Sequence, residues 1–227
     1  MGDFMGIEIY IYIMIFIFGS VMGSFLNVLA MRLSNNESIL WPSSHCHNCN
    51  HRLSWYELIP IVSYHSFGFS YNFVISLIFI SSLIVIIVSD IEYMIILDEI
   101  IAISSISIII LELIFFGLDY TVSKILAGIL AFVTMYVIKL IGDRLFKRES
   151  MGGGDIKLMF LFGIVIGYPL AICDIFLATF IAFPVAIYIL FSRRDNLIPF
   201  GPFLAMAAIL IHISKVDING IITFLVK

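Results

Sequence analysis

The sequence predicts an all-α protein, a polytopic membrane helix bundle with about seven or eight transmembrane helices. Of its 227 residues, 62% are apolar and 12% are charged, whereas soluble domains average roughly 45–50% apolar and about 25% charged residues. The mean hydropathy is +1.13. The apolar residues also gather in windows of roughly 17–25 residues, the length at which a helix crosses a bilayer. Together these observations exclude a soluble domain and a disordered chain.

Several apolar windows have the length of a membrane helix, which satisfies its own backbone groups in lipid. The long ones cover residues 7–31, 73–89, 95–116, 121–141 and 171–191, and two shorter ones cover 156–168 and 198–213. No basic segment precedes the first window, so we interpret it as a retained helix and not as a signal peptide. Residues 56–72 form a poor additional crossing that contains Pro60 and Gly68.

The basic residues predict which side of the membrane each loop faces. Lysine and arginine prefer cytoplasmic loops near helix ends, and placing both basic loops in the cytoplasm puts the segment 90–98 there too. Eight spans keep more basic residues inside than seven. We therefore expect a first membrane helix at 1–31, a cytoplasmic loop with the weak crossing at 32–72, and a membrane bundle at 73–227. The basic residues of the two loops are Arg144, Lys147, Arg148 and Lys157, and Arg193 and Arg194.

Charge and cysteine content exclude two further classes of protein. The chain has 12 Lys and Arg against 16 Asp and Glu, a formal net charge of −4, so it has no basic excess for a nucleic-acid partner. Its three cysteines are too few for a disulfide framework. We expect membrane lipid, and no nucleic acid, around this protein.

Two aspartates at the predicted cytoplasmic edge of the membrane are the candidate catalytic residues. Asp90 ends one apolar window, and Asp155 follows three glycines before another. An ionisable group at such a position costs about 2.5–3.5 kcal/mol on insertion scales and calls for an explanation. Two carboxylates about 3 Å apart share a proton, so that one activates water and the other polarises a carbonyl. The alternative is that both aspartates cap helices.

The residues around Asp155 are the candidate substrate-binding residues. Gly152 and Gly154 lack side chains, so they let a substrate backbone approach closely and let the loop adopt positive φ values. Lys157 is a candidate substrate contact that also lowers the pKa of Asp155 if it lies close by. Its alternative role is that of an anchor whose amine reaches the headgroups.

Other polar residues in the apolar windows have structural interpretations. Glu112 and Asp174 lie deep in their spans and are candidates for hydrogen bonds between helices. Asp98 and Glu99 are expected to cap the start of the next helix.

Five motifs, taken in order, resemble those of the type IV prepilin peptidases, which are membrane aspartic proteases with a GxGDxK signature. The resemblance covers nearly the whole chain, except that a second CxxC found in many relatives is missing. The motifs are Gly23-Ser24-Phe25-Leu26-Asn27, then Cys46-x-x-Cys49 with Trp55-Tyr56-Glu57-Leu58-Ile59-Pro60, then Asp90 with Asp98, then Gly152-x-Gly154-Asp155-x-Lys157, and finally Pro199-Phe200-Gly201-Pro202.

The resemblance implies that Asp90 and Asp155 are catalytic. It implies an endopeptidase in the bacterial cytoplasmic membrane that cleaves, at the cytoplasmic face, the leader of prepilin-like precursors: pilins, pseudopilins or competence pilins. Such substrates present an apolar helix beside the bundle. N-methylation of the new N-terminus with S-adenosylmethionine is a further implied activity. Two alternatives remain, an ion or proton-coupled transporter that uses the intramembrane carboxylates and an assembly platform without catalysis.

The cysteine pair is either part of a zinc site or a reduced pair of thiols in a cytosolic loop. With only Cys46 and Cys49 in the loop, a tetrahedral zinc site needs two more ligands, and the nearby histidines have no regular spacing. We expect no zinc, and proteolysis by an aspartate pair needs no cofactor. The candidate histidines are His45, His47, His51 and His65.

Overall fold

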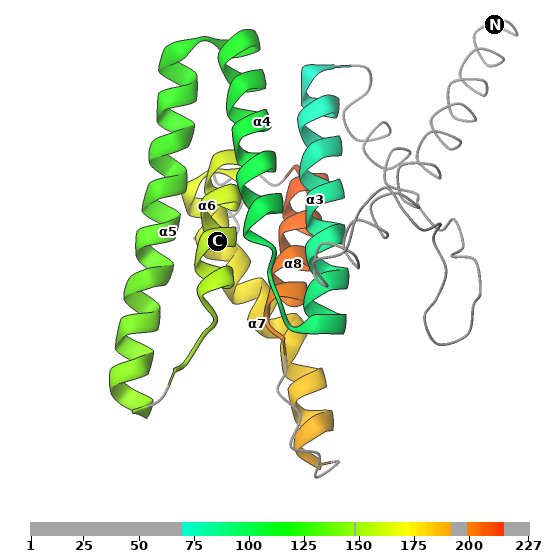
Figure 1. Ribbon diagram of the computed structural model, residues 1–227, viewed down its shortest axis with the longest axis vertical. Helices are drawn as coiled ribbons and strands as arrows, with labels where there is room; N and C mark the ends of the chain where they lie inside the picture. Colours follow the sequence, from blue (N-terminus) through cyan, green and yellow to red (C-terminus); the bar gives the residue numbers. More distant parts are fainter. Residues whose placement is uncertain (1–69, 148, 192–198, 216–227) are drawn as a thin grey trace, which may run out of the picture.

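The computed structural model describes residues 70–147, 149–191 and 199–215, which form six helices (Figure 1). The predicted first helix, nearly all of the segment 32–72 with Cys46 and Cys49, and the pair Arg193 and Arg194 lie outside the described residues. The described part contains helices and no strand, which confirms the all-α prediction. The helices are α3 (Tyr71–Tyr93), α4 (Asp98–Phe116), α5 (Leu118–Phe146), α6 (Gly153–Ile166), α7 (Tyr168–Phe191) and α8 (Gly201–Ser214).

Helix length separates these elements into two groups. Four helices, namely α3, α4, α5 and α7, are long and apolar enough to cross a membrane. Helices α6 and α8 have 14 residues each, about 21 Å at 1.5 Å per residue, which is shorter than the roughly 30 Å hydrocarbon core. The two short windows of the sequence are therefore helices, but they are shorter than a full span.

Glycine and proline account for several helix boundaries. Gly117 and Gly167 end α4 and α6 with φ values of 83° and 85°, a backbone conformation that side chains disfavour. Helix α8 begins at Gly201 with Pro202 in its first turn, where the missing N–H of proline costs no hydrogen bond.

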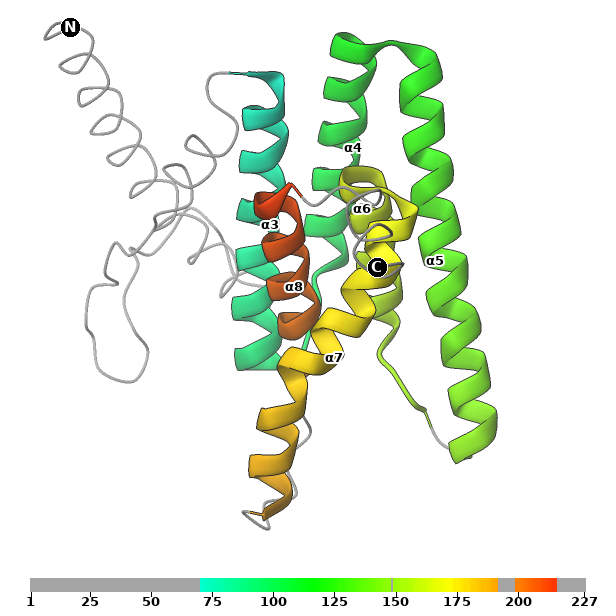
Figure 2. The same ribbon diagram turned by 180° about the vertical axis from the view of Figure 1, so that it is seen from behind.

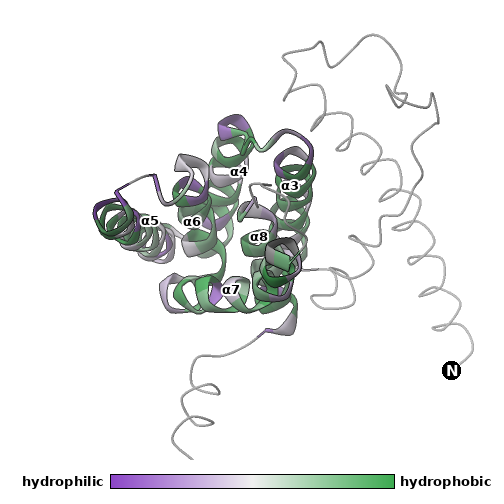
Figure 3. Ribbon diagram, turned by 90° about the horizontal axis from the view of Figure 1, so that it is seen from below, coloured by the Kyte–Doolittle hydropathy of each residue, from purple (hydrophilic) through white to green (hydrophobic). Residues whose placement is uncertain are grey.

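Helix α6 occupies the middle of the bundle. It contacts α4, α5, α7 and α8, and its side chains Leu158, Met159 and Phe162 are fully buried. Seen from the end where α6 begins, α6 lies beside α8, with α3 and α4 on one side and α7 on the other (Figure 3). The first turn of α6 is therefore carried into the interior of the bundle.

Helices α5 and α6 pack with their backbones in contact. A Cβ added at Gly163 would lie 2.5 Å from the Cα of Gly128, and one added at Gly128 would lie 2.9 Å from the carbonyl oxygen of Phe160. Small residues allow this close approach, which is common between membrane helices. The contact holds α6 along its length against the long outer helix (Figure 2).

The outer faces of α5 and α7 are apolar and exposed. A water-soluble monomer rarely exposes so continuous an apolar surface, whereas a membrane protein presents one to lipid. Among the exposed residues are Leu126, Ile129, Leu130, Phe176, Phe180 and Phe183.

Candidate active site

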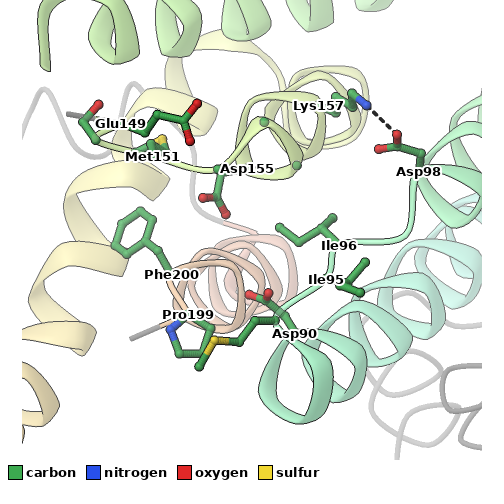
Figure 4. A pocket seen from close by; sticks show the side chains of 15 residues that line it. Asp90, Ile95, Ile96, Asp98, Glu149, Met151, Asp155, Lys157, Pro199 and Phe200 are labelled. Atoms are coloured by element: carbon green, nitrogen blue, oxygen red, sulfur yellow. Dashed lines mark hydrogen bonds and ion pairs between the residues drawn. The ribbon is translucent and has the colours of Figure 1, made fainter. Parts of the chain in front are cut away.

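The two candidate aspartates meet at one end of the bundle. Asp90 lies in the last turn of α3, and Asp155 lies in the first turn of α6. Figure 4 shows the two carboxyl groups pointing toward one another from these two elements. Asp90 and Asp155 are more than sixty positions apart in the sequence. They meet because α3 ends, and α6 begins, at the same end of the bundle.

Both aspartates line a pocket with a volume of about 960 Å³. Its walls are the end of α3, the α3–α4 connection, the segment before α6 and the start of α8. The lining contains four acidic residues and one lysine, so the pocket is acidic. The charged residues are Asp90, Asp98, Glu149, Asp155 and Lys157, and the remaining wall includes Met94, Ile95, Ile96, Met151, Pro199 and Phe200.

The helix-cap alternative does not fit Asp90 and describes only part of what surrounds Asp155. Asp90 lies at the C-terminal end of α3, where the helix dipole disfavours a negative charge. Asp155 lies in the first turn of α6, and its carboxylate accepts a hydrogen bond from the backbone N–H of Gly152, the N-cap residue, as an acid three residues after an N-cap does. The N-cap position of α4 is Leu97 and not Asp98, so the capping role expected for Asp98 is not the one the structure gives it.

The two carboxyl groups are buried although they face the pocket. Each aspartate is 6% exposed. Burial, with the charge of Asp90 as a second cause, raises the pKa of the Asp155 carboxyl to about 7. The Oδ1 atom of Asp155 has no hydrogen-bond partner in the described part of the chain. On the other side, the backbone N–H of Gly201 donates to the carboxylate of Asp90. The backbone N–H of Gly152 donates to the carboxylate of Asp155. Among the described residues the pair therefore has two charge-stabilising backbone donors and one vacant oxygen.

The glycine run before Asp155 differs from the expectation. The loop does not need positive φ, because within the described residues the glycines with positive φ are Gly117 and Gly167. A Cβ at Gly153 would meet nothing within 4 Å, whereas one at Gly154 would lie 2.6 Å from the Cβ of Ile96. Gly154 therefore makes room for a side chain of this protein, and both glycines still line the pocket.

Lys157 forms an ion pair with Asp98 across the pocket rim. Its Nζ lies 2.5 Å from Oδ2 of Asp98, and the two side chains are about half exposed. Figure 4 shows the amine directed toward α4. The structure thus pairs Lys157 with Asp98 and links the first turns of α6 and α4.

The segment that precedes the glycines is fixed on α5. The backbone N–H and the hydroxyl of Ser150 donate to Oδ1 of Asp143 at 2.6 and 2.8 Å. A Cβ at Gly142 would lie 2.7 Å from the Ser150 hydroxyl oxygen, so glycine is needed for this contact. These bonds hold the pocket wall formed by Glu149, Ser150 and Met151.

Two residues beside the aspartate pair could not be identified from the sequence. Ile96 lies in the apolar window 95–116, where nothing in the sequence distinguishes it from its neighbours. Gly201 is one residue of the motif Pro199-Phe200-Gly201-Pro202. A Cβ at Gly201 would lie 2.5 Å from Oδ2 of Asp90. This motif was the available signal for Gly201, but only the fold places Asp90 beside it.

Two segments of the chain match models of known protein families. Residues 17–71 match the model of the bacterial peptidase A24 N-terminal domain, and residues 77–187 match the model of the type IV leader peptidase family. The chain belongs to the type IV leader peptidase family. It is therefore a peptidase, and the four long apolar helices in the described part of the chain make it an integral membrane protein.

Three proteins named prepilin leader peptidase/N-methyltransferase are similar to this chain over different lengths. The Bacillus subtilis protein is 29% identical over 249 residues, covering 94% of this chain and 97% of its own length. The Vibrio cholerae protein is 29% identical, with 90% and 98% covered. The Myxococcus xanthus protein is 25% identical, and the match spans 66% of this chain and 55% of that protein. No solved structure matches the chain at a significant level.

The other functional groups named from the sequence lie away from the pocket. Glu112 and Asp174 are buried, at 3% and 0% exposure, and neither lines it. The described residues contain no cluster of three His, Cys, Asp or Glu side chains that would hold a metal ion. The cysteine and histidine residues named for zinc lie outside the described part, so that expectation stays a prediction.

Proposed function

We propose that this protein is an endopeptidase in which Asp90 and Asp155 cleave the leader of type IV prepilin-like precursors. The observation that supports the proposal most directly is the convergence of two buried carboxyl groups, from α3 and α6, on one pocket. The names of the relatives support the substrate class. The family membership favours this function over a transporter or an assembly platform.

The proposed chemistry follows from a shared proton. One carboxylate removes a proton from water, whose oxygen attacks the scissile carbonyl carbon, while the protonated carboxyl donates to the carbonyl oxygen. Collapse of the tetrahedral intermediate breaks the C–N bond, and the proton taken from water passes to the leaving amine. A pKa of about 7 at Asp155 keeps one proton on the pair below about pH 7.

The pocket suits a basic peptide next to an apolar helix. Asp98 and Glu149 add negative charge beside the aspartates, and complementary charge steers association and fixes register. Arg144 lies in the last turn of α5, whose end leads directly into the pocket wall. By the preference of basic residues for the cytoplasm, we place the pocket at the cytoplasmic face, where a leader would remain.

The test is cleavage of a purified pilin-like precursor by the protein in membranes or detergent. We expect the wild type to release the leader and both Asp90→Asn and Asp155→Asn to leave the precursor intact, with all three proteins equally folded. Cleavage by either asparagine variant at the wild-type rate would rule out the proposed pair.

N-methylation of the new N-terminus is a second candidate function, favoured by the names of the relatives. S-adenosylmethionine supplies a methyl group from a cationic sulfonium. The acidic pocket lining fits such a cation in charge, with Asp98 and Glu149 as the residues that would face it. Mass spectrometry of the cleaved product tests this activity: one added methyl group on the new N-terminus supports it, and an unmodified N-terminus in the presence of S-adenosylmethionine contradicts it.

A further inference from the structure

Ile96 touches both helices that hold the aspartate pair in place. It lies in the connection between α3 and α4, and Figure 4 shows it to one side of the two aspartates, Asp155 and Asp90. A Cβ at Gly154, the residue before Asp155, would lie 3.1 Å from Cδ1 of Ile96, and a Cβ at Gly201 would lie 3.0 Å from the same atom. One methyl group thus fits into the gaps left by two glycines on two helices.

Gly201 also receives the carboxyl group of Asp90. The Oδ2 atom of Asp90 lies 2.5 Å from the position of an added Cβ, and the backbone N–H of Gly201 donates to the same carboxylate. The start of α8 therefore positions Asp90, the start of α6 carries Asp155, and Ile96 contacts both starts.

We propose that Ile96 is a positioning residue whose side chain sets the separation between the first turns of α6 and α8, and through it the approach of Asp155 to Asp90. This inference rests on the proposed function of the two aspartates. In this interpretation Gly154 and Gly201 lack side chains so that Ile96 and Asp90 can pack against them, and not so that a substrate backbone can approach.

Close packing makes such a contact effective. Protein interiors are packed like crystals, so a change of one methylene is felt by the neighbouring elements. A misplacement of about 1 Å between catalytic groups costs up to about 10²-fold in rate. A single side chain between two helices at the pair is therefore sufficient to alter turnover without touching the substrate.

The first experiment removes only the bridging methyl group. Ile96→Val deletes Cδ1, and we expect kcat to fall about tenfold with KM unchanged. Ile91→Val is the matched control, because Ile91 lies on α3 with 58% of its surface exposed and does not line the pocket. The control should leave kcat unchanged.

The pH profile separates positioning from a loss of folded protein. The charged groups that face Asp155 in the pocket are Asp90 from α3, Asp98 from α4, Glu149 before α6 and Lys157 on α6 itself. The charge of Asp90 is one cause of the raised pKa of Asp155, so a wider separation lowers that pKa and moves the alkaline limb of kcat to lower pH. Partial unfolding lowers the apparent kcat but leaves the limb in place.

The second experiment is a double-mutant cycle. We expect Gly154→Ala to lower kcat about 10²-fold beside Ile96, and clearly less in the Ile96→Gly background, where the Cβ at 2.6 Å is gone. Gly153→Ala is the matched control, since a Cβ there would have no atom within 4 Å. Its effect on kcat should be the same with Ile96 and with Ile96→Gly.

Two results would overturn the inference: an unchanged kcat and pH profile in Ile96→Val, or an equal effect of Gly154→Ala in both backgrounds. Asp90→Asn and Asp155→Asn are measured in parallel. If they remain active, the proposed pair fails; if they are inactive while the Ile96 cycle shows no coupling, only the inference about Ile96 fails.

Discussion

Two pairs of buried acids in this bundle differ in what they face. Asp90 and Asp155 are each 6% exposed, and Glu112 and Asp174 are 3% and 0% exposed, so burial alone does not distinguish them. The first pair comes from two helices to one open pocket, whereas the second pair lies among helices. What distinguishes the proposed catalytic pair is therefore its convergence on a cavity and not the depth of its acids.

Glu112 and Asp174 also differ from the aspartate pair in their interactions. Glu112 interacts with the charge of Lys124, and the Nζ of Lys124 donates to the carbonyl oxygen of Val165 at 3.0 Å. This arrangement joins α4, α5 and α6. The carboxylate oxygens of Asp174 have no hydrogen-bond partner among the described residues. Polar contacts between membrane helices account for Glu112, and the structure gives no account of Asp174.

The largest expected effect tests the comparison directly. Asp90→Asn and Asp155→Asn should each lower the cleavage rate by roughly 10³–10⁴-fold, because an amide neither removes the proton from water nor shares one. Asp174→Asn, an isosteric change outside the pocket, should stay within about twofold of wild type. Initial rates on a purified precursor measure all three. An equal loss in Asp174→Asn would remove the distinction between the two pairs.

The pH dependence is the next largest effect. Because the pKa of Asp155 is raised to about 7, cleavage should fall as pH rises through about 7 and the pair loses its shared proton. The folded protein binds this proton more tightly than the unfolded chain, so stability also falls as pH rises from the ordinary value of 3.8 toward 7.

Asp155→Asn should therefore unfold at a higher temperature than wild type at about pH 8, with the difference vanishing at about pH 3. Thermal unfolding in detergent at the two pH values measures it. A stability difference that is the same at both pH values would contradict the raised pKa.

A smaller effect, on the free energy of unfolding, is expected for Glu112. Glu112→Gln leaves the partly buried Lys124 without its charge partner and should cost about 1 kcal/mol of unfolding free energy, with the turnover of the folded protein unchanged. Glu92→Gln on the exposed part of α3 is the control and should change neither. A loss of turnover in folded Glu112→Gln would place Glu112 in the chemistry.

The smallest effect concerns the rim of the pocket. Lys157 and Asp98 are about half exposed, and such pairs contribute at most about 1 kcal/mol. We expect Asp98→Asn to raise KM about threefold, within that range, because it removes one of the negative charges that suit a basic leader. Lys157→Met should change KM less, because it removes the ion pair and leaves the charge of Asp98 in place. Steady-state kinetics separates the two variants, and an unchanged KM in Asp98→Asn would remove that role.

The helices could be predicted from the sequence because lipid imposes a strong constraint. An apolar segment in a membrane must satisfy its backbone groups internally, so length and hydropathy are sufficient to locate α3 to α8 within a few residues. Asp90 and Asp155 were also visible, since a carboxyl group at the edge of an apolar window is costly and therefore conspicuous. The sequence alone determined the bundle and the two acids.

Only the tertiary structure decided what surrounds those acids. The partner of Lys157, the contact of Ser150 with Asp143, and the place of Ile96 between Gly154 and Gly201 all join residues from different helices. Helical periodicity says which residues share a face of one helix, but it carries no information on which faces meet. An isoleucine in an apolar window looks like every other, and its position beside the aspartate pair arises only when α3, α6 and α8 pack together.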